Sequence, residues 1–174
     1  MVKIQKFPQK LAKYLADKKI KHKILQHKLV YTAYDAAATT KRKLAETVKT
    51  LLVMADKGFY LVLLPADQKL DLKKLAKLIS QKSGKVVKKV TIPSEKVMEK
   101  VLKVKAGAMS AFGGIHKLPV IMDKSLIKVK KAIFATGSFN HSIEMAVKDF
   151  IKQEKAILGS FGVKKIKLVV KKKK

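Results

Sequence analysis

Apolar residues recur along the chain at two spacings, one typical of helices and one typical of strands. Runs of apolar residues predict strands at 22–27, 51–55, 59–64, 85–90, 118–122, 132–135 and 163–170. Helical spacing predicts helices at 8–18, 33–38, 72–81 and 94–102, and residues 143–145 are expected to continue into a helix that ends before Gly159.

Polar residues and glycines mark the boundaries between these segments. Thr32 and Asp71 are placed to cap the helices that follow them, and Pro93 opens another helix. Asp56-Lys57-Gly58 separates two apolar runs, which is a signal for a β-hairpin. Because hairpin and helical connections mix without a regular βαβ repeat, we expect an α/β (α+β) fold built on a mixed β-sheet.

Length and composition indicate one globular unit. With 174 residues, of which 48% are hydrophobic, the chain is large enough to bury a substantial core. No internal repeat or long linker divides the sequence, so residues 1–170 are expected to form a single domain. The last four residues, Lys171–Lys174, are expected to form a disordered lysine tail.

The formal net charge of +29 calls for an explanation. Arg42 is the one arginine among 41 basic residues, whereas proteins that read bases through paired hydrogen bonds usually recruit arginine. A lysine surface instead suits salt-dependent attraction to RNA phosphates with little sequence information. The alternative is a bias in amino-acid usage that spreads solvated lysines over the surface, and the sequence leaves both interpretations open.

Several classes of protein lack support in the sequence. No apolar run approaches the roughly 18 residues of a membrane span, and the first residues lack the apolar core of a signal peptide, so we expect a cytoplasmic protein. Cysteines, dinucleotide motifs and phosphate loops are absent and the histidines lack metal-ligand spacing, so neither a cofactor nor a metal is expected. The N-terminal helix has few bulky apolar anchors, which ranks a membrane-surface protein last. We expect a monomer.

Three separated segments carry candidate chemistry. Lys49 precedes an apolar strand, residues 106–114 form a glycine-rich loop, and residues 136–144 place a histidine in a turn of small residues. A lysine, exposed backbone amides and an imidazole are able to polarise and cleave an ester carbonyl without a metal. Each segment also has an ordinary structural interpretation, because lysines abound in this chain and glycine-rich turns are common.

Two side chains in these segments suggest more specific roles. Phe112 is a candidate platform on which a base stacks, and the alternative is a half-buried residue of an ordinary turn. His141 and Ser142 are adjacent in an extended segment and therefore point to opposite faces, which argues against a Ser-His catalytic pair.

Six sequence blocks follow one another along most of the chain. They are Val48-Lys-Thr-Leu-Leu-Val53, Leu63-Leu-Pro-Ala66, Leu70-Asp-Leu-Lys-Lys-Leu-Ala76, Gly107-Ala-Met-Ser-Ala-Phe-Gly113, Leu118-Pro-Val-Ile-Met-Asp123 and Gly137-Ser-Phe-Asn-His-Ser-Ile-Glu144. Together, from about His22 to Gln153, they resemble the YbaK/ProX family of aminoacyl-tRNA editing domains. The resemblance implies a mixed β-sheet or partly closed barrel flanked by helices, and hydrolysis of misacylated tRNA.

The resemblance also implies roles for individual residues. Lys49 matches the family's essential lysine, residues 107–113 match its backbone pocket, and residues 137–142 match the turn that holds the amino acid and the terminal ribose. Ser110-Ala111 stands where the family often has two prolines, and an aspartate that some members carry near Ser142 is absent. These departures concern which amino acid is removed rather than the reaction.

The resulting hypothesis is a free-standing trans-editing hydrolase that deacylates mischarged tRNA, with alanyl- or cysteinyl-tRNA(Pro) as the expected substrate. The reaction is expected to be metal-independent and assisted by the ribose hydroxyl of the substrate. The expected partners are the acceptor end of aminoacyl-tRNA and, as a candidate, prolyl-tRNA synthetase. The alternative is a non-catalytic basic RNA-binding module of the same fold. The expected catalytic residues are Lys49 and His141, and the expected substrate-binding residues are Thr32, Gly107, Ser110, Phe112, Gly113, Gly114, Gly137, Ser138 and Ser142.

Overall fold

The computed structural model describes residues 4–104 and 109–165. Its helices are α1 (Gln9–Asp17), α2 (Ala33–Thr40), α3 (Leu72–Ser83), α4 (Glu95–Leu102), α5 (Gly113–His116) and α6 (Val147–Glu154), with 3₁₀ helices η1 (Leu44–Glu46) and η2 (Lys124–Lys128). Its strands are β1 (Lys23–Gln26), β2 (Val48–Ala55), β3 (Gly58–Pro65), β4 (Gln68–Leu70), β5 (Val90–Thr91), β6 (Val120–Asp123), β7 (Lys131–Ala135), β8 (His141–Ala146), β9 (Ile157–Gly159) and β10 (Gly162–Lys164). The predicted lysine tail, Lys171–Lys174, lies outside the described residues.

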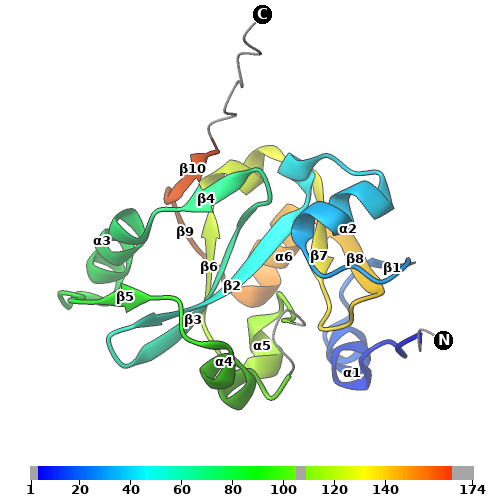
Figure 1. Cartoon of the computed structure of the whole chain (residues 1–174), viewed down its shortest axis with the longest axis horizontal. Coiled ribbons are helices and arrows are strands. Elements are labelled where there is room, and N and C mark those ends of the chain that lie inside the picture. The colour runs from blue at the N-terminus through cyan, green and yellow to red at the C-terminus, as the bar shows by residue number, and fades with distance from the viewer. Residues whose placement is uncertain (1–3, 105–108, 166–174) are drawn as a thin grey trace, which may run out of the picture.

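Within the described ranges the strands form three sheets (Figure 1). The largest has the order β5-β2-β3-β6-β9, in which β2 runs antiparallel to β3 and β5, whereas β6 runs parallel to β3 and β9. A second, antiparallel sheet has the order β1-β8-β7, and β4 pairs with β10. The mixed sheet with flanking helices confirms the fold class expected from the sequence.

The two larger sheets meet at the start of β2. Thr47, directly before β2, pairs with Ile133 of β7 in an isolated parallel bridge that joins the five-stranded sheet to the three-stranded one. Figure 1 shows α2 beside this junction, near the start of β2 and the β7–β8 pair. The pocket described below lies at this junction.

Side-chain alternation along β2 separates two apolar clusters, one on each face of the five-stranded sheet. Val48 and Leu52 belong to one cluster, and Val53 belongs to the other. Because successive side chains of a strand point to opposite faces, Thr50 shares the face of Val48 and Leu52. Lys49 starts from the opposite face, which it shares with Val53. This alternation therefore places the side chains of Lys49 and Thr50 on opposite faces of β2.

The structure confirms the helices α1 to α4 and the β2–β3 hairpin that the sequence predicts. Thr32 Oγ1 accepts a hydrogen bond from the Asp35 amide at 3.1 Å, as expected of an N-cap. Asp71 Oδ1 accepts hydrogen bonds from the Lys73 and Lys74 amides in the same way. Local capping chemistry therefore sets the starts of both helices.

Residues 85–90 do not form the predicted strand. Only Val90–Thr91 pairs, as β5 against the end of β2. The reason is the side chain of Asp56, whose carboxylate accepts hydrogen bonds from the backbone amides of Lys88 and Lys89. These amides are thereby diverted from a strand ladder, and an apolar run that reads as a strand stays irregular.

The structure differs from two further predictions about the C-terminal third of the chain. Residues 143–145 do not lead directly into a helix but belong to β8, where Ile143 pairs with Ile24 on one side and Phe134 on the other. The helix α6 starts only after this strand. The predicted strand at 163–170 is β10 at its beginning, and the part of it beyond residue 165 lies outside the described residues.

Candidate active site

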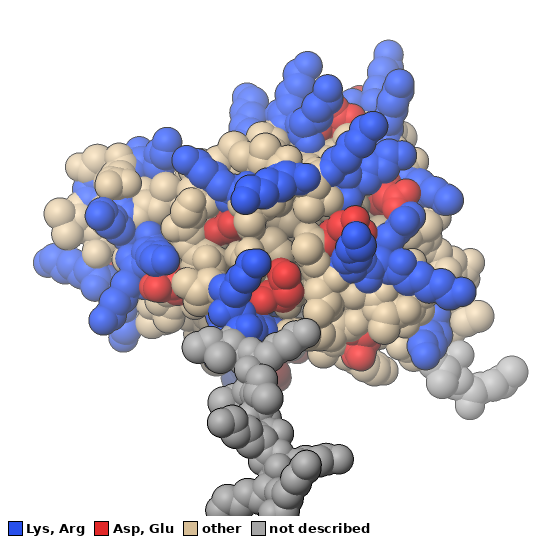
Figure 2. Space-filling model, turned by 90° about the horizontal axis from the view of Figure 1, so that it is seen from above, with Lys and Arg blue, Asp and Glu red and all other residues tan. Residues whose placement is uncertain are grey.

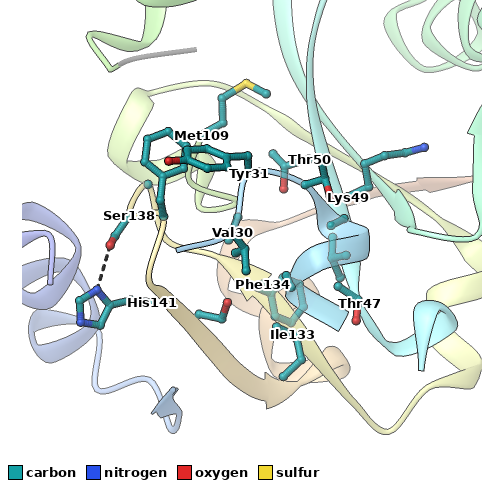
Figure 3. Close-up of a pocket in the computed structure, with 18 of the residues that line it drawn as sticks. Val30, Tyr31, Thr47, Lys49, Thr50, Met109, Ile133, Phe134, Ser138 and His141 are labelled. Carbon is teal, nitrogen blue, oxygen red and sulfur yellow. Dashed lines mark hydrogen bonds between the residues drawn. The ribbon is translucent and has the colours of Figure 1, made fainter. Parts of the chain in front are cut away.

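A pocket of about 260 Å³ lies where α2, β2, β7 and the turn between β7 and β8 meet (Figure 3). Its apolar walls include Val30, Val48, Ile133 and Phe134. The pocket brings together a large part of the predicted site, namely Thr32, Lys49, Gly137, Ser138, His141 and Ser142. These residues come from three regions of the chain that only the fold makes neighbours.

Lys49 lines the pocket, but its ammonium group points away from Ser138 and His141 (Figure 3). Lys49 Nζ donates a hydrogen bond to the backbone carbonyl oxygen of Gln68 at 2.6 Å. Partial burial lowers the pKa of Lys49, and the nearby ammonium group of Lys165 lowers this pKa further. The nearby Asp67 carboxylate acts in the opposite direction, and Lys69 lowers the pKa as well. The ammonium group therefore lies at the edge of the pocket in a setting where positive groups outnumber the one carboxylate, which favours an anion.

Thr50 presents a hydroxyl group from the opposite face of β2 and also lines the pocket. Its Oγ1 atom is buried and has no hydrogen-bond partner within residues 4–104 and 109–165. A buried hydroxyl without a partner destabilises a protein by about 1–3 kcal/mol unless water or a ligand satisfies it. The Thr50 hydroxyl is therefore a candidate contact for a polar atom of a bound substrate.

The turn between β7 and β8 is held by a small network around Ser138. Gly137 has a φ of +88°, which residues with a Cβ atom rarely adopt. Ser138 Oγ donates to Asn140 Oδ1 at 2.8 Å and lies 2.8 Å from His141 Nδ1 (Figure 3). Burial lowers the pKa of His141, and the nearby His27 lowers it further. Because Ser138 directs its proton to Asn140, the neutral His141 ring carries its proton on Nδ1 and donates to Ser138.

Ser142 pairs with a distant histidine rather than with its neighbour in sequence. Ser142 Oγ lies 2.8 Å from His27 Nε2, and His27 Nδ1 lies 2.8 Å from the carbonyl oxygen of Lys28. A carbonyl oxygen only accepts, so Nδ1 carries a proton, and in the neutral form of the ring the Ser142 hydroxyl donates to Nε2. The lone pairs of Ser142 Oγ then remain available as acceptors at the wall of the pocket.

Phe112 is a core residue, which corrects its interpretation as a stacking platform. Its side chain is 0% exposed and packs edge-on against Phe150, with the ring centroids 5.3 Å apart. The rings of Phe134 and Tyr14 surround it at 6.4 and 6.3 Å. Ser110, two residues earlier, is also buried. A base has no access to a ring that other rings enclose.

The glycines of the same loop serve packing. A Cβ atom on Gly113 would collide with neighbouring backbone, and one on Gly114 would collide with the ring of Tyr14. The Gly114 amide donates to Glu154 Oε2 at 2.9 Å, so it is already engaged rather than directed at an oxyanion. Neither glycine is among the residues that line the pocket, and Gly107 lies outside the described residues.

Several residues that line the pocket are not predicted from the sequence. Thr50 follows the lysine directly, and strand alternation alone is enough to place it on the other face of β2. Tyr31 and Phe139 also line the pocket. Tyr31 lies outside the motif blocks, and Phe139 lies within the block 137–144 without having been assigned a role. His27 reaches Ser142 only because β1 pairs with β8 in one particular register, for which the sequence carries no visible signal.

Lysines are spread over the surface rather than gathered at the pocket. Figure 2 shows lysine and arginine side chains across the visible face, with a smaller number of acidic residues between them. Arg42 forms an ion pair with Glu144 of β8, so this guanidinium group is held by the structure. A diffuse positive surface of this kind attracts polyanions without orienting them closely.

The described part of the chain offers neither a metal site nor a membrane span. Within it, no group of three or more histidine, cysteine, aspartate or glutamate side chains is arranged to hold a metal ion. No helix in the same ranges has both the length and the apolar character needed to cross a bilayer.

The architecture and the pocket define a mixed α+β domain with a ligand-sized chamber at the corner between two sheets. The sequence model of the aminoacyl-tRNA editing domain matches residues 27–153, which include the whole pocket. The chain belongs to the aminoacyl-tRNA editing domain family. This result confirms the resemblance to the YbaK/ProX family indicated by the sequence motifs.

Individual proteins agree with this assignment. The prolyl-tRNA editing protein ProX of Acetoanaerobium sticklandii is 33% identical over 119 residues, which are 65% of this chain and 69% of that protein. A crystal structure of a candidate trans-editing enzyme for prolyl tRNA synthetase superimposes with a TM-score of 0.73 at 19% identity, covering 91% of this chain and 96% of that one. The hypothetical protein APE2540 gives a TM-score of 0.75 at 20% identity, covering 88% and 99%. At these identities the two structures show the fold alone.

Proposed function

We propose that this protein is an aminoacyl-tRNA deacylase that removes a wrongly attached amino acid from tRNA in trans. The observation that carries the proposal is the pocket itself, which is lined by Lys49, Thr50 and Ser142 inside the segment that matches the editing-domain family. The buried Thr50 hydroxyl has no hydrogen-bond partner among the described residues. The relative named as a prolyl-tRNA editing protein supports tRNA(Pro) as the substrate tRNA and prolyl-tRNA synthetase as a candidate partner.

Lys49 is proposed to hold the substrate through a phosphate at the pocket edge. Its ammonium group is bonded to the Gln68 carbonyl oxygen and stands near Lys165, outside the centre of the chamber. Exchanging that carbonyl oxygen for a phosphate oxygen would offset the burial and the repulsion from Lys165 that together lower the pKa of Lys49. The terminal nucleotide would then place its acyl group in the chamber.

The chamber is proposed to bind the reacting end of the substrate. Thr50 Oγ1 and Ser142 Oγ would take polar atoms of the aminoacyl group, and His141 with Ser138 would hold the ribose or the amino group. The backbone amide of Gly137 would stabilise the oxyanion, since the amides of Ser138 and Phe139 are already engaged by Thr136 Oγ1 and Gln5 Oε1. A water molecule oriented by the ribose hydroxyl adds to the ester carbonyl. The bond to the ribose oxygen then breaks, and the proton that the water gives up passes to that oxygen. This scheme releases the amino acid and intact tRNA without a metal.

The walls of the chamber favour a small amino acid. Val30, Ile133 and Phe134 supply apolar surface in a space of about 260 Å³ that also has to admit the ribose. We therefore propose that the amino acid removed is alanine or cysteine, because both side chains are small and neither brings a charge into an apolar site.

A deacylation assay on a panel of charged tRNAs tests the proposed function. Alanyl- and cysteinyl-tRNA(Pro) are expected to lose their amino acid faster than correctly charged prolyl-tRNA(Pro), and EDTA is expected to leave the rate unchanged. A shift in tRNA mobility without release of amino acid would instead support the non-catalytic RNA-binding module. Inhibition by EDTA that added metal reverses would contradict the metal-free scheme.

The lysine surface is expected to supply affinity for the body of the tRNA. The logarithm of the binding constant should then fall linearly with the logarithm of salt concentration, with a slope of about −0.7 to −0.9 per phosphate neutralised. The single-turnover rate at saturating enzyme should change much less, because the reacting groups are partly shielded from ions. Deleting Lys171–Lys174 should flatten the slope modestly. A flat salt dependence of the intact chain would mean that the lysines reflect compositional bias.

A further inference from the structure

Two aromatic rings form part of the rim of the pocket. Tyr31 is 65% exposed, Phe139 is half-buried, and both residues line the pocket. Their ring centroids are 5.0 Å apart and their planes are tilted by 52°. An exposed aromatic side chain beside a second ring at the mouth of a pocket offers a flat apolar surface that a ligand ring is able to cover.

Hydrogen bonds fix the backbone segments that carry the two rings before any ligand binds. The amide of Val30, next to Tyr31, donates to the carbonyl oxygen of Phe139 at 2.8 Å. The amide of Phe139 donates in turn to Gln5 Oε1 at 2.9 Å. The two segments that carry the rings are therefore tied to each other. A surface arranged in advance loses less conformational entropy when a ligand binds.

Tyr34 also lines the pocket and is 43% exposed, but Lys165 occupies one face of its ring. Lys165 Nζ lies 4.2 Å from the centroid of the Tyr34 ring and donates a hydrogen bond to the Tyr34 hydroxyl. The ammonium groups of Lys165 and Lys49 lie on this side of the rim beside the Asp67 carboxylate, so positive charge exceeds negative charge there. The rim thus presents an accessible aromatic surface at Tyr31 and positive charge at Tyr34, an arrangement that matches the base and the phosphate of one nucleotide.

We propose that the unpaired adenine at the 3′ end of the substrate tRNA stacks on the Tyr31 ring, with Phe139 behind it. This assignment deepens the proposed function and rests on it. Unpaired bases stack on exposed aromatic side chains in single-stranded RNA recognition, whatever their sequence. Stacking at the rim fixes the nucleotide whose ester enters the chamber, and it gives Tyr31 the role that the buried Phe112 is unable to fill.

A fluorescence experiment tests the stacking without requiring catalysis. The probe is an uncharged acceptor-end oligonucleotide with 2-aminopurine in place of the terminal adenine, whose emission is quenched by stacking. Binding to the unmodified protein and to Tyr31→Phe is expected to quench the probe. Tyr31→Ala should abolish most of the quenching and weaken affinity by about 5- to 150-fold. The matched control is Ile127→Ala, which removes a 51% exposed apolar side chain outside the pocket and should change neither.

Undiminished quenching in Tyr31→Ala would overturn the assignment. A kinetic comparison provides a second test, with alanyl-adenosine and an alanyl ester of abasic ribose as substrates. Tyr31→Ala is expected to lower kcat/KM for the ester that carries the base and to leave the abasic ester unchanged, while an equal loss on both would reject stacking. If the unmodified protein hydrolyses neither ester and no charged tRNA, the proposed deacylation fails, whereas the quenching still decides whether the base stacks on Tyr31.

Discussion

Replacing Lys49 with alanine is expected to lower kcat/KM for deacylation by about 10- to 150-fold, the loss that corresponds to removing one charge-assisted hydrogen bond to a substrate phosphate. The fold should remain, because the side chain contributes a single hydrogen bond to the Gln68 carbonyl oxygen and its ammonium group is penalised by burial. We expect the free energy of unfolding to change by about 1 kcal/mol or less. Single-turnover kinetics and urea unfolding of the same preparation provide the two measurements.

The matched control for this variant is Lys69→Ala. Lys69 is exposed on β4, next to Gln68, and removing it changes the net charge by the same amount. Its positive charge also lowers the pKa of Lys49, so its loss should slightly favour the charged form of Lys49 and leave deacylation close to normal. Near-normal turnover in Lys49→Ala would show that Lys49 takes no part in deacylation. Equal losses in the two variants would show that Lys49 acts only through the general positive field.

Local signals in the sequence are sufficient for most of the fold. Thr32 and Asp71 cap the helices they are predicted to cap, and the hairpin turns at the predicted place, because these features depend on residues two or three positions apart. The strand predicted at 85–90 fails for a non-local reason. Asp56, more than thirty residues away, takes the backbone amides that a strand would have used.

The candidate site is less accessible to sequence reasoning than the fold. The motif identifies Lys49, but only the sheet shows that its ammonium group leaves the chamber while the Thr50 hydroxyl faces it. The contact between His27 and Ser142 joins residues 115 positions apart and depends on the register of β1 against β8. Slipping a strand by one residue exchanges its two faces, so this contact depends on the exact register of β1 against β8. The spacing of motifs along the chain does not specify that register.

Phe112 is the clearest case in which burial overrides a plausible motif. Replacing Phe112 with alanine is expected to lower the free energy of unfolding by about 3–5 kcal/mol, because it leaves a cavity among aromatic rings. The ring stacks edge-on against Phe150 and is fully enclosed. Tyr31→Ala should change the free energy of unfolding by only about 0.5 kcal/mol, since Tyr31 is 65% exposed. Urea denaturation followed by circular dichroism compares the two variants.

Activity measurements on a folded variant complete this comparison. Phe112→Leu keeps much of the apolar volume, so its destabilisation should be smaller than that of Phe112→Ala and the protein should stay folded at assay temperature. Any change in its activity should be the same for esters with and without a base, because a core residue acts through the packing of Phe134 at the pocket wall. Tyr31→Ala should show the reverse pattern, with a base-dependent loss and little destabilisation. A loss confined to base-containing esters in Phe112→Leu, with stability unchanged, would return the stacking role to Phe112 and require its ring to leave the core.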